Sequence, residues 1–163
     1  MKGMDMMHLS DSCLFAVVLA YSLNLAPMMF ESFTSDRIWA SNPPDSFYMF
    51  LGRYGQQTTH YWKVVSPLAT LTFVLSLVFN WHIVGRRTWL LVALACYLMV
   101  QVATMTFFVP EQEALITNAG TLPRDTIRAR AHRWIFLNYF RNVAGVLAYV
   151  FLMCAVLVPS QSL

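Results

Sequence analysis

The sequence predicts an all-α integral membrane protein, a four-helix bundle in a single domain over residues 1–163, and two observations support this class. First, 58% of the residues are hydrophobic and only 12% are charged, with a mean hydropathy of +0.52, whereas soluble domains are roughly 45–50% apolar. Second, four apolar segments each approach the roughly 20 residues that a helix needs to cross hydrocarbon. They are residues 13–33, 62–81, 89–109 and 134–158.

Charge and motifs exclude several classes of function. The net charge of +3 is small and scattered along the chain, which argues against a nucleic-acid partner. The chain has no CxxC, HExxH, GxSxG or glycine-rich phosphate loop, the signatures of common soluble enzymes. The cysteines Cys13, Cys96 and Cys154 fall within apolar segments without paired spacing, so they are expected to be small buried hydrophobic residues without disulfides.

The first apolar segment carries polar residues near its end. Asn24 and Glu31 are seven residues apart and therefore share one face of a helix. Pro27 is expected to kink the helix between them. Glu31 thus lies where polar groups from other spans can gather.

The long first loop, residues 34–61, predicts a further helix. After Pro43 and Pro44, either Asp45 or Ser46 can cap a helix. The following apolar residues have helical spacing: Phe47, Phe50, Leu51 and Tyr54. We expect an interfacial helix that lies on the bilayer and roofs one end of the bundle.

The remaining connections set the topology. A tight turn at residues 82–87 predicts that the second and third spans are antiparallel neighbours. The third span is expected to end at Pro110, followed by a second long loop over residues 111–133. Four spans place both long loops at one membrane face and the termini at the other. At that other face Asn80 and His82 are almost the only polar residues expected within the bundle.

Lysine and arginine counts predict the orientation. The positive-inside rule weighs the basic residues in the loops. On the long-loop side these are Arg37, Arg53, Lys63, Arg124, Arg128, Arg130 and Arg133, against Lys2, Arg86 and Arg87 on the other side. The rule places the long loops in the cytoplasm, for a protein of the bacterial inner membrane.

The last span carries the arginine around which the predicted site is organised. Trp134, Asn138, Arg141, Gly145 and Ala148 fall in one stripe at about 100° per helical residue. A charge in hydrocarbon costs several kcal/mol, so the guanidinium is expected to face the bundle. The small residues below it let a neighbouring helix approach closely. The alternative is that the arginine reaches out to lipid headgroups.

Two chemistries fit the polar residues that converge at the long-loop end. In the first, Arg141 binds the oxygen of a largely apolar molecule, a buried carboxylate of Glu31 or Glu111 removes a proton, and the arginine stabilises the resulting oxyanion. The residues expected to bind this substrate are Trp134, Asn138, Arg141 and Gln101.

In the second chemistry, carboxylates and imidazoles from several helices hold a transition metal. The ligands would be Glu31, His60, Glu111 and His132, and either histidine could instead hold a haem. Its geometric weakness is that His132 points away from the arginine's stripe if the last helix begins before it.

Two stretches of the C-terminal half carry a resemblance to a known family. Residues 108–115 read FVPEQEAL and residues 134–141 read WIFLNYFR. They resemble the anthrone-oxygenase-like family of small four-helix membrane proteins, in which the fourth span begins W-x-x-x-N-x-x-R. Residues 30–33 and 47–62 are similar to bacterial members. The asparagine that the family places shortly after the proline is Gln112 or Glu113 here.

The resemblance implies oxidation of an anthrone to an anthraquinone by O₂, without a clear cofactor. We therefore expect a membrane oxygenase-type enzyme that acts on a hydrophobic phenolic, anthrone-like or quinone-like molecule, with the cofactor left open between none, a haem and a transition metal. The alternative is a non-catalytic membrane subunit that binds haem, metal, quinone or lipid within a larger complex. Beyond lipid and the small molecule, the partners left open are a second copy and another membrane subunit.

Overall fold

The computed structural model describes residues 2–51 and 53–159, and this part of the chain is helical with no strand. Four of its helices are long and apolar enough to cross a membrane, which confirms the predicted all-α fold class. These candidate spans are His8–Trp39, Thr58–Phe79, Val84–Thr117 and Arg124–Leu157. The elements in chain order are α1 (Lys2–Phe33), α2 (Ser35–Trp39), η1 (Asp45–Phe50), α3 (Arg53–Phe79), α4 (Val84–Ala103), η2 (Thr104–Phe108), α5 (Val109–Thr117) and α6 (Arg124–Leu157).

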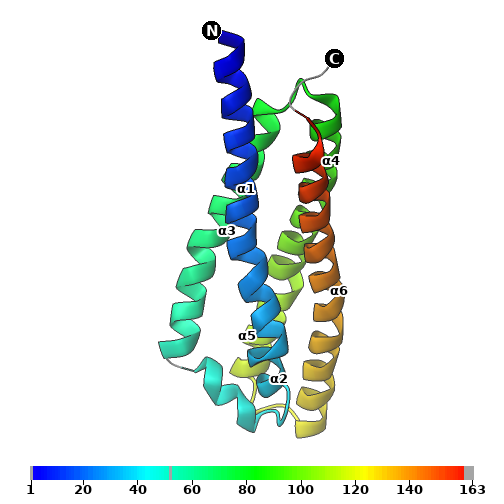
Figure 1. Ribbon diagram of the computed structural model, residues 1–163. Coiled ribbons are helices and arrows are strands. Elements are labelled where there is room, and N and C mark those ends of the chain that lie inside the picture. Colours follow the sequence, from blue (N-terminus) through cyan, green and yellow to red (C-terminus); the bar gives the residue numbers. More distant parts are fainter. Residues whose placement is uncertain (1, 52, 160–163) are drawn as a thin grey trace.

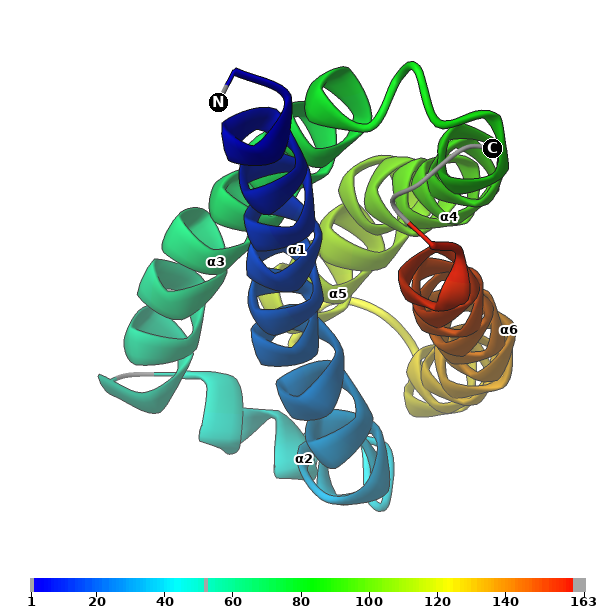
Figure 2. The ribbon, with the colours of Figure 1, turned by 45° about the horizontal axis from the view of Figure 1, so that its top comes forward.

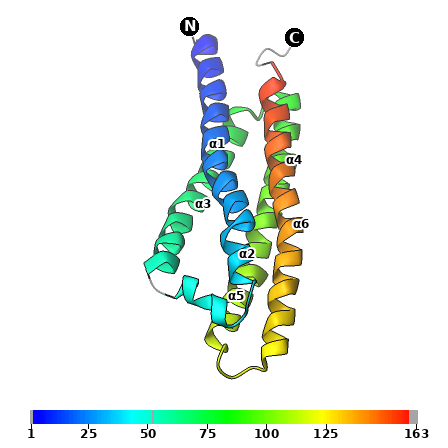
Figure 3. The same ribbon diagram turned by 60° about the horizontal axis from the view of Figure 1, so that its bottom comes forward.

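The long helices form two pairs, α1 with α3 and α4 with α6 (Figure 2). Both chain ends and the α3–α4 turn lie at one end of the bundle, and the two longer connections lie at the other, as predicted (Figure 1). Figure 3 brings that second end forward, where α2, η1, α5 and the start of α6 gather. We call it the long-loop end.

The third and fourth spans are longer than the sequence predicts. The third continues through Pro110 to Thr117, and α6 already begins at Arg124, so the second loop shrinks to residues 118–123. Proline within a helix clashes with the carbonyl of the preceding turn. Here the five residues before Val109 form a π-helical turn, whose wider backbone gives the proline ring room. At 34 residues, α6 is about 51 Å long, well beyond the ~30 Å of hydrocarbon.

The first loop also differs from its prediction. Residues 45–50 form a short 3₁₀ helix instead of an amphipathic α-helix. The Ser46 hydroxyl donates to the Trp39 carbonyl (2.5 Å) and caps no helix. Phe47 is buried and stacks on the Trp39 ring, with centroids 5.2 Å apart. The predicted contribution of Tyr54 lies outside the described side chains. Residues 45–50 therefore pack against the long-loop end of the bundle, because Phe47 stacks on Trp39 there.

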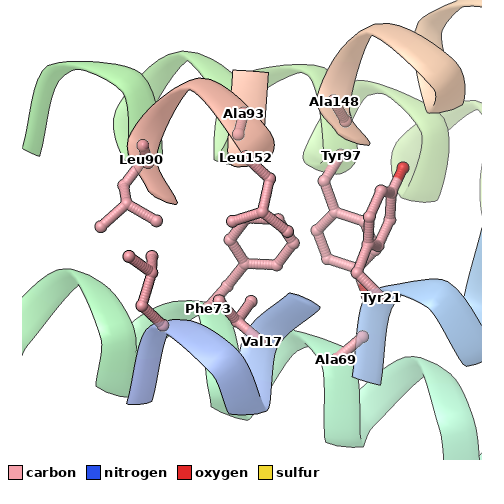
Figure 4. Packing of buried hydrophobic residues seen from close by; sticks show 11 residues of the cluster. Val17, Tyr21, Ala69, Phe73, Leu90, Ala93, Tyr97, Ala148 and Leu152 are labelled. Atoms are coloured by element: carbon pink, nitrogen blue, oxygen red, sulfur yellow. The ribbon is translucent and has the colours of Figure 1, made fainter. Parts of the chain in front are cut away.

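The core between the two helix pairs is built from aromatic rings and small residues (Figure 4). Tyr21, Phe73 and Tyr97 form a cluster with centroids 5.2–5.6 Å apart. The Tyr21 hydroxyl donates to the Gly145 carbonyl (2.9 Å), which ties α1 to α6. A Cβ on Gly145 would lie 2.6 Å from the Met28 side chain. The small residue thus permits the close approach that its position in the stripe predicts.

The end with the chain termini holds a polar network that the sequence analysis did not expect. Arg86 is only 4% exposed, and its guanidinium donates to the Asp11 carboxylate (2.6 Å), the Asn80 side-chain oxygen (3.0 Å) and the Val158 carbonyl (2.8 Å). The expectation that Asn80 and His82 stand almost alone there is wrong. We call this group the Arg86 clasp, because it joins α1, the α3–α4 turn and the end of α6.

Candidate functional site

Arg141 extends from α6 into the bundle, as its stripe predicts. Its guanidinium carbon lies 4.5 Å from the centre of the Phe108 ring and 5.9 Å from that of Trp134. One terminal nitrogen, Nη1, contacts the Thr104 hydroxyl at 3.4 Å. Both Thr104 and Phe108 belong to the π-helical turn η2, and such turns are frequent at functional sites. The guanidinium is therefore held mainly by aromatic faces, which attract cations.

Among the described residues, no carboxylate is in direct contact with this arginine. Asp36 and Glu31 interact with it electrostatically, yet Arg141 is not among the ion pairs within 4.0 Å that the described residues form. Its Nε is buried and has no hydrogen-bond partner in the part of the chain that the structure describes. Buried polar groups are nearly always paired. A guanidinium with an unused buried donor beside two carboxylates is a candidate site for an oxygen atom of a ligand.

Asp36 is the site residue that the sequence analysis missed. It lies on α2 and is 6% exposed. The Asn138 amide nitrogen donates to its carboxylate (2.8 Å) and also to the Ser32 hydroxyl (3.1 Å). The predicted first span ends at Phe33, which places Asp36 in a loop. The sequence feature that could have identified Asp36 is its position four residues after Ser32. In a continuous helix this spacing places the two side chains on the same face.

Two asparagines of α6 turn their nitrogens toward α1. The Asn142 nitrogen donates to Ser32 (2.8 Å), alongside the donation from Asn138, while the Ser32 hydroxyl itself donates to the Met28 carbonyl (2.9 Å). The Ser32 hydroxyl hydrogen is donated to Met28, and the Asp36 carboxylate can only accept. The side-chain nitrogens of both asparagines therefore face α1 and α2. The side-chain oxygens of Asn138 and Asn142 are buried and have no partner within residues 2–51 and 53–159.

The two predicted bases occupy different surroundings. Glu31 is half-buried at the end of α1, where it forms a side-chain hydrogen bond with Trp62 and interacts with Asp36 and Arg141. Glu111 lies on α5 and is held at both oxygens by Arg130, at 2.7 and 2.6 Å. This two-point contact fixes α5 against α6. The structure therefore brings Glu31 to the arginine and engages Glu111 elsewhere.

The predicted metal ligands are not gathered in one place. His132 is exposed on α6, as its position relative to the stripe indicates, and His60 is exposed on α3. Within the described residues no group of three histidine, cysteine, aspartate or glutamate side chains is placed to hold a metal ion. Glu31 and Glu111 have the separate partners given above.

Of the other predicted substrate-binding residues, Trp134 packs against the arginine. Trp134 is buried, and its indole nitrogen donates to the Phe108 carbonyl (2.9 Å) at the end of the π-helical turn. Its ring also meets that of Trp39 at 5.1 Å. Gln101 is half-buried on α4, three residues before Thr104. The site thus combines an aromatic wall, amides and carboxylates around one cation.

The sequence was compared with known families and proteins. A family model described as anthrone oxygenase matches residues 56–151, a range that includes Trp134, Asn138 and Arg141, whereas Glu31 and Asp36 precede it. Neither the search of curated proteins nor that of solved structures finds a match. Because the matched range covers more than half of the chain, this four-helix membrane protein belongs to the anthrone oxygenase family.

Proposed function

We propose that this protein is a membrane oxygenase that acts on a hydrophobic phenolic molecule of the anthrone or quinone type, at the long-loop end of the bundle. One observation supports this most: the Arg141 guanidinium lies among aromatic rings, and within the described part of the chain its buried Nε has no partner and no carboxylate lies within ion-pair distance. Preorganised donors in a water-poor site stabilise a developing oxyanion strongly. An anthrone is flat, apolar and acidic beside its carbonyl, so its enolate suits such a site.

In this reaction Glu31 removes a proton from the carbon opposite the ketone, and the electron pair moves to the ketone oxygen, which Arg141 binds. The enolate then attacks O₂ at that carbon and forms a peroxide. Loss of the remaining hydrogen there, with cleavage of the O–O bond, leaves a second ketone and one water. One O₂ is thus consumed, and the substrate supplies all four electrons.

The assignment of Glu31 as base follows from the hydrogen bonds around each carboxylate. Glu111 is engaged at both oxygens by Arg130, and Asp36 is used to orient Asn138. Among the described side chains, Glu31 forms a hydrogen bond with Trp62 and no ion pair within 4.0 Å. Asn138 and Trp134 would orient the substrate, and Gln101 would line the far side of the site.

The test is oxidation of 1,8-dihydroxyanthrone by the protein in lipid nanodiscs, followed by O₂ uptake and anthraquinone absorbance with empty nanodiscs as the blank. We expect Arg141→Lys to lower the rate by about 10²-fold, because lysine keeps the charge and loses the planar fork of donors. Arg130→Lys is the matched control in the same helix and should retain the rate. A wild-type rate equal to the blank, or equal rates in the two variants, would refute the proposal.

The alternative is a non-catalytic subunit that binds haem, metal, quinone or lipid. An open, largely apolar groove between α1 and α6 favours this reading, since such a groove could hold a hydrophobic molecule without any reaction. An optical spectrum and metal analysis of the purified protein separate these cases. A Soret band would indicate haem bound through His60 or His132.

We also propose that the long loops face the cytoplasm of a bacterial inner membrane. The basic residues at that end outnumber those at the other, although Arg130 and Arg86 are each engaged by a carboxylate. Labelling of a cysteine introduced at Thr121, in the α5–α6 loop, by a membrane-impermeant reagent tests this. Labelling of intact cells from the periplasmic side would reverse the orientation.

A further inference from the structure

A groove of about 270 Å³ runs between α1 and α6. Its walls are apolar and include Phe33, Val143, Val146 and Leu147, which are among the exposed hydrophobic residues of the bundle. Because these side chains belong to the surface of membrane-spanning helices, the groove opens toward lipid. Its volume is near the lower end of the roughly 300–1,000 Å³ found for small-molecule sites.

Two polar residues, Ser32 and Asn142, also line this groove. Both are 5% exposed, and the Asn142 nitrogen donates to the Ser32 hydroxyl at 2.8 Å. The Asn142 oxygen has no partner among the described residues. The neighbouring Asn138, one turn earlier on α6, repeats this pattern, with its nitrogen used and its oxygen free.

Among the described residues, the unpartnered side-chain atom of this groove's lining is thus the Asn142 oxygen, a hydrogen-bond acceptor. In this network the Ser32 hydroxyl gives its hydrogen to the Met28 carbonyl and accepts from both amide nitrogens. The Asn138 nitrogen also faces the Asp36 carboxylate, which can only accept. A ligand that satisfies this groove must therefore bring a donor. An acyl chain has none, and a quinone has only acceptors.

We propose that the α1–α6 groove binds the hydroxyl-bearing ring of an aromatic ligand that arrives from the lipid, and that Asn142 is the residue that selects a hydroxyl group there. The proposal rests on the proposed function, since Asn142 is adjacent in sequence to Arg141 and shares Ser32 with Asn138. The two neighbouring side chains of α6 then have complementary roles. Arg141 offers donors to a ketone oxygen on one side, and Asn142 offers an acceptor to a phenol on the other. This distinguishes the reduced, hydroxylated substrate from a simple quinone.

The test uses a matched pair of probes, 2-naphthol and its methyl ether 2-methoxynaphthalene, which differ in one hydrogen-bond donor. Binding to the protein in phosphatidylcholine nanodiscs is measured by calorimetry, with empty nanodiscs subtracted. We expect the wild type to bind 2-naphthol about tenfold more tightly than the ether. Asn142→Leu, which removes the acceptor, should bring the two affinities together.

A second pair of variants tests the groove itself. Val146→Phe fills the groove and should weaken both probes by about tenfold or more, while Val150→Phe, one turn further along α6, adds the same ring outside the lining. Both positions are exposed hydrophobic residues, so each tolerates an apolar ring. Equal binding of the two probes to the wild type, an unchanged preference in Asn142→Leu, or equal effects of the two phenylalanines would overturn the proposal.

These outcomes are separable from those of the proposed function. If Asn142→Leu does not fold, the wild-type preference and the Val146→Phe and Val150→Phe pair still decide. Arg141→Lys should lose anthrone oxidation and retain the preference for 2-naphthol. A protein that oxidises the anthrone but shows no preference would refute the groove assignment alone, and one that shows the preference without turnover would refute the oxygenase alone.

Discussion

Replacing Arg86 with methionine is expected to destabilise the protein by about 2–6 kcal/mol, because two hydrogen-bond acceptors lose their donor. The structure indicates where this loss arises. The Asn80 side chain is fully buried and loses the guanidinium that donates to its oxygen at 3.0 Å, and the Val158 carbonyl loses a donor at 2.8 Å. Each acceptor left without a donor costs about 1–3 kcal/mol. The Asp11 side chain is 39% exposed, so water compensates part of its loss.

The adjacent Arg87 provides the control. It packs on the Trp81 ring with its guanidinium carbon 5.2 Å from the centroid and makes only a 3.4 Å contact to a carbonyl, so Arg87→Met should cost about 1 kcal/mol or less. Unfolding of both variants by sodium dodecyl sulfate in mixed micelles, followed by tryptophan fluorescence, measures the difference. If Arg86→Met were no more destabilising than Arg87→Met, the clasp would contribute nothing beyond surface charge.

Three further predictions concern helix contacts. Gly145→Ala should cost about 1 kcal/mol, because the atom nearest to the new methyl is the flexible end of Met28, and Gly145→Val should cost about 1–3 kcal/mol. Both losses are measured as earlier unfolding in detergent. Glu111→Gln should lower the unfolding free energy by about 1 kcal/mol by weakening its half-buried contact with Arg130. Anthrone turnover should change less than about twofold. A large loss of turnover at unchanged stability would instead indicate that Glu111 is the base. Trp134→Phe should lower the unfolding free energy by about 1 kcal/mol, since a 2.9 Å hydrogen bond to a backbone carbonyl is lost, and an unchanged unfolding midpoint would contradict it.

Much of the fold could be predicted because membrane helices follow simple rules. A run of apolar residues of the right length must be helical to satisfy its own backbone in lipid, and this located the four spans. The spacing of polar and small residues along α6 then predicted which face turns inward, and Asn138 and Gly145 are buried as expected. Both inferences concern a single helix at a time.

The predictions that were wrong concern contacts between helices or departures from regular helix geometry. A proline usually ends a helix, so the third span is predicted to end at Pro110. The composition of residues 104–108 does not predict the π-helical turn that precedes the continuation of this span. Asp36 was assigned to a loop because the apolar run ends at Phe33, whereas α2 resumes after one irregular residue, Thr34. Which carboxylate lies beside Arg141 depends on that continuation, and the hydropathy of the sequence does not encode it.

The two arginines buried at opposite ends of the bundle give an internal comparison. Arg86 donates three hydrogen bonds, to a carboxylate, an amide oxygen and a backbone carbonyl, so its charge is matched by the protein alone. Arg141 makes one 3.4 Å hydroxyl contact, and its Nε has no partner in the described part of the chain. The Arg86 contacts show that this fold can pair a guanidinium fully with its own acceptors. Asp36 interacts electrostatically with Arg141 and could have served as such an acceptor. The Asp36 carboxylate instead accepts a hydrogen bond from Asn138, and this contrast with Arg86 supports the proposal that the Arg141 donors bind a ligand.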